Sequence, residues 1–265
     1  MDEEKIKIVA LVCSPRKGRN SEYLAREALK SAEQMGNIKT ELVPLYDKTI
    51  KPCIGCYRCD MAAEDEKRIC PAIKDDFEAV VSKLIDADGI IISTPVYFGG
   101  VTAQLKAFID RCECISGYGN RRWLRNPMRN KPAGAIAVGA LPGGGMEWAL
   151  DTINHYFMAM QMIIASAVEG PAGSVGTIGS AWACLYPGNS LEPHAVEKDE
   201  LGLEGARCIG RRIAILCKLL PRSVRKQERE EWIDWADAQM KNWKKKGFLA
   251  AKFTEMERRK PINKS

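Results

Sequence analysis

The sequence predicts an α/β protein in which a five-stranded parallel sheet is covered by helices on both faces. Short β-branched apolar runs alternate five times with segments whose apolar residues recur at helical spacing. Parallel neighbours in a sheet need crossover connections, which helices provide. The 265 residues, 46% of them hydrophobic, suffice for one such domain plus an extension. We divide the chain into a sheet domain, residues 1–200, and a helical C-terminal extension, residues 201–265.

The strands are expected where apolar runs that are short for a helix are bounded by turn residues. The first run, IKIVALVC, is rich in β-branched residues and stops at Ser14-Pro15, and GIIIST stops at Pro95. Both runs are continuous, which is typical of parallel strands that are buried on both faces. The expected strands cover residues 6–13, 40–45, 89–94, 131–139 and 162–168.

The helices are expected where apolar residues recur at intervals of three and four. In the first helix, Leu24 and Ala28 share a face, and Gly36 stands where a glycine commonly ends a helix. Asp75 or Asp76 can cap the second helix. The expected helices cover residues 21–35, 76–86, 102–114, 146–159, 199–219 and 224–246.

The C-terminal region carries the net positive charge. The chain has a formal net charge of +6, and residues 218–265 hold 14 Lys and Arg against 7 Asp and Glu. Basic tails can contact nucleic acid or membranes, but a solvated helix face is the commoner explanation, so we expect no nucleic-acid partner. The last helix carries a group of large side chains near one face. We expect this face to pack on the core, and packing on a partner subunit is the alternative hypothesis. The residues are Trp232, Trp235, Gln239, Met240 and Trp243.

The sequence predicts a cytoplasmic protein without a membrane span. Met1 to Lys7 are mostly charged and lack the pattern of a secretory signal. The longest apolar stretch, Met158–Val168, is interrupted by Gln161 and Ser166. Because the cytosol keeps thiols reduced, the ten cysteines indicate metal ligation or redox chemistry instead of disulfides.

The loop after the first strand has the composition of a phosphate site. In open parallel sheets, ligands bind at the carboxyl ends of the strands. This loop feeds a helix start, where backbone N–H groups and the helix dipole favour an anion. The sequence contains neither GxxxxGK[ST] nor GxGxxG there, which argues against ATP and dinucleotide sites. The alternative is a capped helix start with solvated basic residues. The candidate residues are Ser14, Arg16, Arg19, Asn20 and Ser21.

Two further loops at the same edge could hold a flat ligand. Thr94–Gly100 combines aromatic and apolar side chains with glycine, which suits a planar ring or, alternatively, a hydrophobic turn. Gly139–Glu147 offers backbone N–H groups to a carbonyl or a developing anion, or else is a flexible connector. The candidate residues are Pro95, Val96, Tyr97, Phe98, Gly99, Gly139, Gly143, Gly144 and Gly145.

An insertion at residues 48–71 carries the most specific local motif. Cys53, Cys56, Cys59 and Cys70 form C-x2-C-x2-C-x10-C, a spacing that can occupy the corners of an iron-sulfur cubane. Gly55 helps the backbone to wrap tightly. Structural zinc on four thiolates and a metal-free loop are the alternatives.

The other cysteines and the two histidines are assigned simpler roles. Four cysteines lie on apolar runs and are expected in the core: Cys13, Cys184, Cys208 and Cys217. A redox role is conceivable for Cys112 and Cys114, which lie at a helix end. His155 and His194 lack ligand or triad spacing and receive no chemical role.

Together, SPRKGRNS, TPVYFGG and VGALPGGG resemble the NAD(P)H-dependent FMN reductase family over residues 5–170. The resemblance implies a flavodoxin-like fold with strand order 2-1-3-4-5. It further implies that Ser14, Arg16, Asn20 and Ser21 hold the FMN phosphate. Residues 95–99 and 143–145 would border the isoalloxazine ring.

The cysteine motif further resembles that of the iron-sulfur flavoproteins, which bind a 4Fe-4S cluster near FMN. The gap before Cys70 is longer here, which leaves the fourth ligand open. The resemblance implies an electron-transfer oxidoreductase that moves electrons between a two-electron donor, FMN and the cluster, with no classical catalytic residue. It implies ferredoxin or NAD(P)H as redox partner, and a homodimer or homotetramer. The alternatives are a cluster-free NAD(P)H-dependent FMN or quinone reductase and a non-catalytic flavin-binding module.

Overall fold

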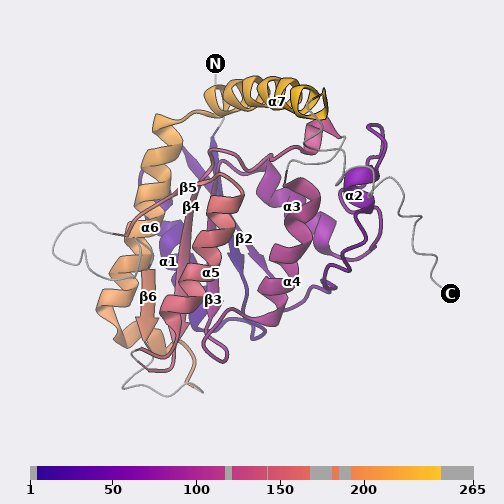
Figure 1. Ribbon diagram of the computed structural model, residues 1–265. Helices are drawn as coiled ribbons and strands as arrows, with labels where there is room; N and C mark the ends of the chain where they lie inside the picture. The colour runs from indigo at the N-terminus through magenta and orange to yellow at the C-terminus, as the bar shows by residue number, and fades with distance from the viewer. Residues whose placement is uncertain (1–4, 117–120, 142, 168–180, 185–191, 246–265) are drawn as a thin grey trace.

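A parallel sheet forms the centre of the molecule (Figure 1). The computed structural model describes residues 5–116, 121–141, 143–167, 181–184 and 192–245. The strands are β1 (Ile6–Val12), β2 (Ile38–Pro44), β3 (Gly89–Pro95), β4 (Pro132–Gly139), β5 (Ile163–Ile164) and β6 (Ala181–Cys184). The order β2-β1-β3-β4-β5 confirms the predicted flavodoxin-like sheet. Every described pairing in it is parallel.

The fifth position of the sheet differs from the prediction. The strand expected over residues 162–168 is reduced to β5, which pairs with Pro132 and Ala133. Farther along β4, residues Ile136–Gly139 pair with β6. Two segments therefore share the edge that one strand was expected to cover. The short β6 sequence AWAC lies in a Gly- and Ser-rich stretch, where four apolar residues carry no periodic signal.

Helices cover both faces of the sheet, and each face has its own buried cluster. On one face lie α1 (Asn20–Glu33) and α6 (Glu200–Leu219), and on the other lie α3 (Phe77–Asp86), α4 (Ala103–Arg111) and α5 (Met146–Ala159) (Figure 1). The backbones of α1 and α6 approach closely, because a Cβ at Gly210 would lie 1.9 Å from the Ala28 carbonyl oxygen. Glycine is therefore required at this crossing.

Short helices and one long helix complete the fold. They are α2 (Arg58–Met61), the 3₁₀ helices η1 (Cys112–Ile115), η2 (Arg122–Leu124) and η5 (Ala195–Lys198), and α7 (Arg222–Lys245). Among the described residues, no helix is long and apolar enough to span a membrane. The boundary after residue 200 stays a prediction; α6, which follows it, packs on α1 and the sheet.

The last helix, α7, lies along the edge of the sheet at which the strands begin (Figure 1). Arg222 and Arg225 pair there with Asp88, which precedes β3. The expectation that the tryptophan face packs on the core is wrong for Trp235 and Trp243, which are 58% and 45% exposed. Among the described side chains of this helix, Ile233 is fully buried, and it lay outside the predicted face.

Candidate functional site

A pocket of about 300 Å³ lies at the carboxyl edge of the sheet, where the loops after β1, β3 and β4 meet. Its lining residues are Ser14, Arg16, Arg19, Asn20, Ser21, Pro95, Val96, Tyr97, Val138 and Ala140. Eight of these ten were candidates from the sequence. The structure thus brings the whole candidate phosphate loop together with the first half of the candidate ring loop.

The start of α1 leaves donors available to a ligand. The helix begins at Asn20, and its N-cap residue, Arg19, makes no side-chain capping bond. Asn20 is not a cap: its Oδ1 accepts a hydrogen bond from the Val196 amide at 3.1 Å. Its Nδ2 is buried and has no partner among the described residues. A buried donor without a partner is costly, so this amide favours an acceptor such as a phosphate oxygen in the pocket.

The chain around the phosphate loop holds it in shape. Gly18 has φ of +64°. Its amide donates to Glu22 at 2.8 Å, and its carbonyl lies 2.9 Å from Nε2 of His194. The Glu22 carboxylate is paired with Arg26 at 2.6 Å, which compensates a negative charge that would otherwise oppose an anion nearby. His194 thus has a structural role at this loop.

The residues expected to border a ring divide into two groups. Pro95, Val96 and Tyr97 line the pocket. Phe98 is fully exposed at φ of +49°. Phe98 and the candidate glycines do not line this pocket; these glycines are Gly99, Gly139, Gly143, Gly144 and Gly145. The two glycine loops nevertheless meet, because a Cβ at Gly145 would lie 2.5 Å from the Gly99 Cα.

These features fit FMN. The pocket offers buried amide and hydroxyl groups and guanidinium cations at a helix start, as a phosphate monoester requires. Proline, valine and tyrosine form its other wall, as a partly apolar ring requires. Volume and donor set therefore agree with a phosphate-bearing tail and part of a ring.

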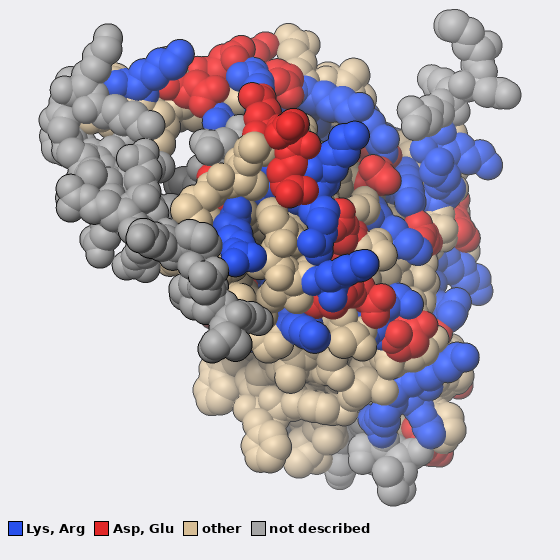
Figure 2. Space-filling view, turned by 90° about the vertical axis from the view of Figure 1, so that its right-hand side faces the viewer, with Lys and Arg blue, Asp and Glu red and all other residues tan. Residues whose placement is uncertain are grey.

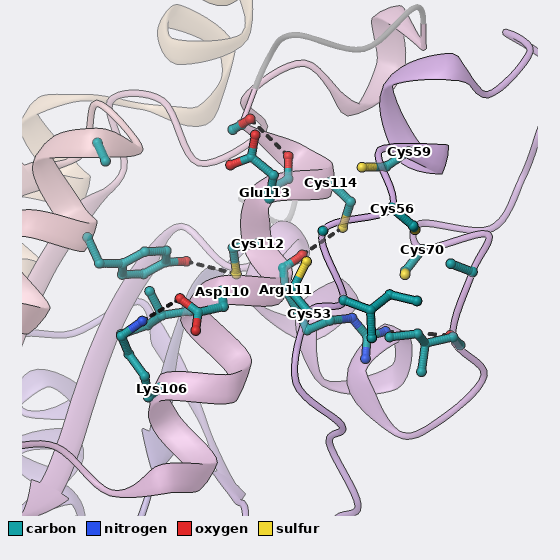
Figure 3. Close-up of a pocket in the computed structure, with 18 of the residues that line it drawn as sticks. Cys53, Cys56, Cys59, Cys70, Lys106, Asp110, Arg111, Cys112, Glu113 and Cys114 are labelled. Carbon is teal, nitrogen blue, oxygen red and sulfur yellow. Dashed lines mark hydrogen bonds and ion pairs between the residues drawn. The ribbon is translucent and has the colours of Figure 1, made fainter. Parts of the chain in front are cut away.

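A second pocket of about 770 Å³ is lined by all four cysteines of the motif. Cys53, Cys56, Cys59 and Cys70 come from the insertion on one side (Figure 3). The opposite wall is formed by α5 and by the end of α4 with η1, which adds Cys112 and Cys114. The thiols that the sequence grouped by spacing are thus grouped in space.

The thiols surround a cavity without converging on one point. Among the described residues, no three His, Cys, Asp or Glu side chains are gathered as ligands of a single metal ion. The backbone turns twice through left-handed conformations, at Gly55 (φ +61°) and Tyr57 (φ +54°). The irons of a cubane lie at separate corners, so thiols spread around a cavity suit it better than they suit one zinc ion.

Burial affects the protonation of these thiols. It is the main reason why the pKa of Cys59 is raised to about 12, and the charges of Asp60 and Cys70 add to the effect. Cys70 is 9% exposed, whereas Cys53 is exposed. Iron binds thiolate, so a metal group held here would displace the proton of the Cys59 thiol.

A buried ion pair closes the neck of the insertion. The side chains of Arg111 and Asp75 are 1% and 3% exposed, and their charged atoms are 2.8 Å apart. Asp75 also accepts from the amides of Lys51, at 2.8 Å, and Phe77, at 3.1 Å. Asp76 is the N-cap residue of α3, but its carboxylate accepts from the Thr49 amide instead of capping the helix. The two ends of the loop are thereby joined.

Cys112 and Cys114 are thiols held by hydrogen bonds. The Tyr156 hydroxyl lies 3.5 Å from the Cys112 sulfur, and burial raises the pKa of Cys112 to about 12. The Cys114 thiol donates to the Arg111 carbonyl at 2.9 Å, and burial raises its pKa as well. Their redox role stays a prediction. The expected core positions of Cys13, Cys208 and Cys217 are confirmed, whereas the Cys184 side chain lies outside the described residues.

The cysteine pocket is lined by α4 from Lys106 onward, whereas no described residue of α4 lines the pocket at the carboxyl edge. No described residue lines both. Thr102, which caps α4, donates to the Cys13 carbonyl just before the phosphate loop, and Arg111 ends the helix beside the cysteines. At a rise of about 1.5 Å per residue, Thr102 and Arg111 are separated by roughly 14 Å along the helix.

Sequence reasoning missed the arginines that hold the insertion. Arg111 and Arg121 are buried beside the cysteine loop and bond to its carbonyls. An arginine carries no signal in sequence that distinguishes a buried contact from a solvated one. For Arg121, the available cue was the arginine-rich run RRWLRNPMRN, which follows the expected third helix.

Comparisons with known proteins agree with the geometry. The family described as NADPH-dependent FMN reductase matches residues 6–175. The chain belongs to the NADPH-dependent FMN reductase family. It is 37% identical over 215 residues to an iron-sulfur flavoprotein of Methanocaldococcus jannaschii, covering 81% of this chain and 99% of the relative. It is 32% identical to an iron-sulfur flavoprotein of Archaeoglobus fulgidus, covering 78% and 94%. This FMN reductase family member is thus a flavin-dependent oxidoreductase, as predicted.

The solved structures support the fold. The structure of RosB with the bound intermediate 8-demethyl-8-formylriboflavin-5'-phosphate aligns with a TM-score of 0.61 over 88% of this chain and 87% of that one, at 17% identity. At that identity the likeness concerns the fold alone. It agrees with the strand order of this FMN reductase family member.

Proposed function

We propose that the chain binds FMN in the pocket at the carboxyl edge. Ser14, Arg16, Asn20 and Ser21 would hold the phosphate, with Arg19 adding positive charge, and residues 95–97 would contact the ring. The buried Nδ2 of Asn20, which has no partner among the described residues, supports the phosphate assignment. The meeting of Gly99 with Gly145 supports the assignment of the two glycine loops to the ring side.

The second part of the proposal is a 4Fe-4S cluster on Cys53, Cys56, Cys59 and Cys70. The observation that carries it is that all four thiols of the motif line one pocket. Their spread around a cavity suits a cubane. The relatives named iron-sulfur flavoproteins cover most of this chain, and their names agree with the assignment.

The two groups would make the chain an electron-transfer flavoprotein. FMN supplies two-electron chemistry and a cluster supplies one-electron chemistry. The chain's own part is to bind and orient: the phosphate loop fixes one end of the cofactor, and the apolar wall excludes water from the other. No acid or base is required. We retain ferredoxin or NAD(P)H as the proposed redox partner, a homodimer or homotetramer as the assembly, and the cytoplasm as the location.

The test is anaerobic purification of the whole chain followed by an absorbance spectrum and by FMN, iron and sulfide analysis. We expect about one FMN with four iron and four sulfide per chain, and bleaching on reduction. A protein that contains FMN but no iron would favour the alternative of a cluster-free NAD(P)H-dependent FMN or quinone reductase. A protein whose bound FMN is reduced by none of the donors would favour a non-catalytic flavin-binding module. A colourless protein that takes up neither group would overturn both parts.

A further inference from the structure

Arg121 is enclosed by the cysteine loop. The residue is 1% exposed, and it is among the largest fully buried side chains. Its Nη2 donates to the Ile69 carbonyl at 3.0 Å and to the Cys59 carbonyl at 3.3 Å, and its Nη1 donates to the Arg68 carbonyl. One side chain thus joins the two arms of the loop, the arm that carries Cys59 and the arm that leads into Cys70.

The charge of this guanidinium is not neutralised. Among the residues that the structure describes, no carboxylate lies within ion-pair distance of Arg121, and its Nε has no partner. The charge of Asp60 interacts with that of Arg121, but the two side chains form no ion pair. Arg111 is the contrast, because it is buried beside the same loop and is paired with Asp75.

A buried cation without a counterion is unfavourable, because carbonyl dipoles solvate the charge and do not cancel it. The cysteine pocket would supply the missing anion once it is loaded. Four thiolates around a 4Fe-4S core leave a net negative charge in both the oxidised and the reduced state. Charges close to a cluster, and hydrogen bonds around its ligands, set its reduction potential.

We propose that Arg121 is the positioning residue of the cysteine loop and the counterion of its metal cluster. The inference rests on the proposed function for the presence of the cluster. The clamp, by which we mean the hydrogen bonds from Arg121 to the two arms of the loop, is a separate part of the proposal and does not depend on metal. Arg121 donates to the carbonyl of Cys59 and to that of Ile69, which precedes Cys70, and is not itself a metal ligand.

The C-terminal helix supports the backbone that carries Arg121. Arg229 of α7 donates to the carbonyls of Arg125, at 2.8 Å, and Trp123, at 3.0 Å. Arg122 pairs with Asp234 of α7 at 2.7 Å. Figure 2 shows Asp and Glu beside Lys and Arg along the top of the molecule, where α7 lies. The helix thus docks through opposite charges on the segment that begins with Arg121.

The experiment compares wild type, Arg121→Met, Arg121→Lys and Arg212→Met, purified anaerobically as whole chains. Arg212→Met is the matched control, since it makes the same substitution in α6, on the other face of the sheet from α4 and α5. The first readout is the midpoint potential of the cluster from a redox titration followed by electron paramagnetic resonance. The second is the rate of limited proteolysis within residues 51–74 of iron-free protein.

We expect Arg121→Met to lower the midpoint potential, because loss of the cation disfavours the more negative reduced cluster. It should also speed cleavage of the loop several-fold. Arg121→Lys should keep the potential near that of wild type while cleavage still rises, because one ammonium cannot bridge both arms. Arg212→Met should change neither.

Equal potentials in iron-loaded wild type and Arg121→Met would overturn the counterion role, and equal cleavage rates would overturn the clamp. Should Arg121→Met fail to fold, Arg121→Lys decides the clamp by the same proteolysis. A midpoint potential of Arg121→Lys clearly different from that of wild type would then count against the counterion role, because this variant keeps the positive charge. Wild type without iron would overturn the proposed function itself, and the proteolysis would still decide the clamp.

Discussion

The pocket at the carboxyl edge and the cysteine pocket are built in different ways. The first follows from topology: parallel strands end at one edge, and backbone amides and the start of α1 supply the donors. The second lies off the sheet, in an insertion shaped by side-chain contacts of Arg111 and Arg121. The first should therefore tolerate changes that leave the sheet intact, whereas the second should depend on a few buried charges.

The largest effect is expected from Cys56→Ser. Serine is a poor ligand for a soft metal site, so we expect the iron content to fall several-fold or to zero. FMN binding should stay unchanged, because Cys56 does not line the proposed FMN pocket. Iron and FMN analyses of the same anaerobic preparation check this. Joint loss of both groups would show that the two regions are not independent.

The next largest effect is expected from Asp88→Asn, which tests the docking of α7. Arg225 and Asp88 are buried and lie 2.7 Å apart. Removing one partner of a buried pair leaves an uncompensated charge, so we expect a loss of about 3 kcal/mol in unfolding free energy. Urea unfolding at pH 7 measures it. An effect within the error of the measurement would show that this pair does not hold α7.

The same residue predicts a pH dependence. Burial opposes ionisation of Asp88, but hydrogen bonds from Arg222, the Lys7 amide and Arg225 outweigh it, so its pKa is lowered. A carboxyl whose pKa is lowered in the folded state stabilises the fold at pH values above its unfolded-state pKa of about 3.9. That contribution is lost as the pH falls through the lower folded value. Asp88→Asn should therefore flatten the loss of stability below about pH 4, and an unchanged acid profile would contradict the assignment.

A smaller effect is expected from Asn20→Asp at the proposed FMN pocket. The substitution keeps the acceptor for the Val196 amide and replaces the unpartnered Nδ2 donor by a carboxylate oxygen. Loss of a charge-assisted bond plus repulsion should weaken FMN binding about 10- to 100-fold. Fluorescence titration with FMN measures it. Asn37→Asp, an equal change of charge at the exposed start of β2, is the control, and equal affinities of the two variants would remove Asn20 from the phosphate site.

The smallest effect is expected from Cys114→Ser. If the four thiols of the loop are the ligands, Cys114 is surplus, and a serine hydroxyl can replace its bond to the Arg111 carbonyl. Iron content should stay within error of wild type. A clear loss of iron would instead make Cys114 a ligand and leave the role of Cys70 open.

The same comparison explains what could be predicted from the sequence. The phosphate loop was predictable, because Ser14 to Ser21 lie between a strand and a helix whose patterns are strong, and topology then fixes where they meet other loops. The cysteines were predictable as a set from their spacing. Each of these predictions depends on residues that are near one another in the chain.

The contacts that the sequence does not predict join distant residues. Asn20 binds the Val196 amide, 176 positions away, and Arg121 binds the Ile69 carbonyl, 52 positions away. A carbonyl has no sequence signature, so an arginine that recognises one leaves no pattern. The strand β6 was missed for a related reason, since four residues are too few for a period to be detected.

The contact of Gly210 with Ala28 limits which substitutions this chain can accept in α6. Ala28 lies two turns along the helix whose start would grip the cofactor's phosphate. Any residue with a side chain at 210 must push the two helices apart, because the atom it would strike is backbone and cannot rotate away. A substitution in α6 can thus loosen the start of α1, and with it the proposed FMN site, without touching the pocket, so libraries that vary α6 should keep glycine at this position.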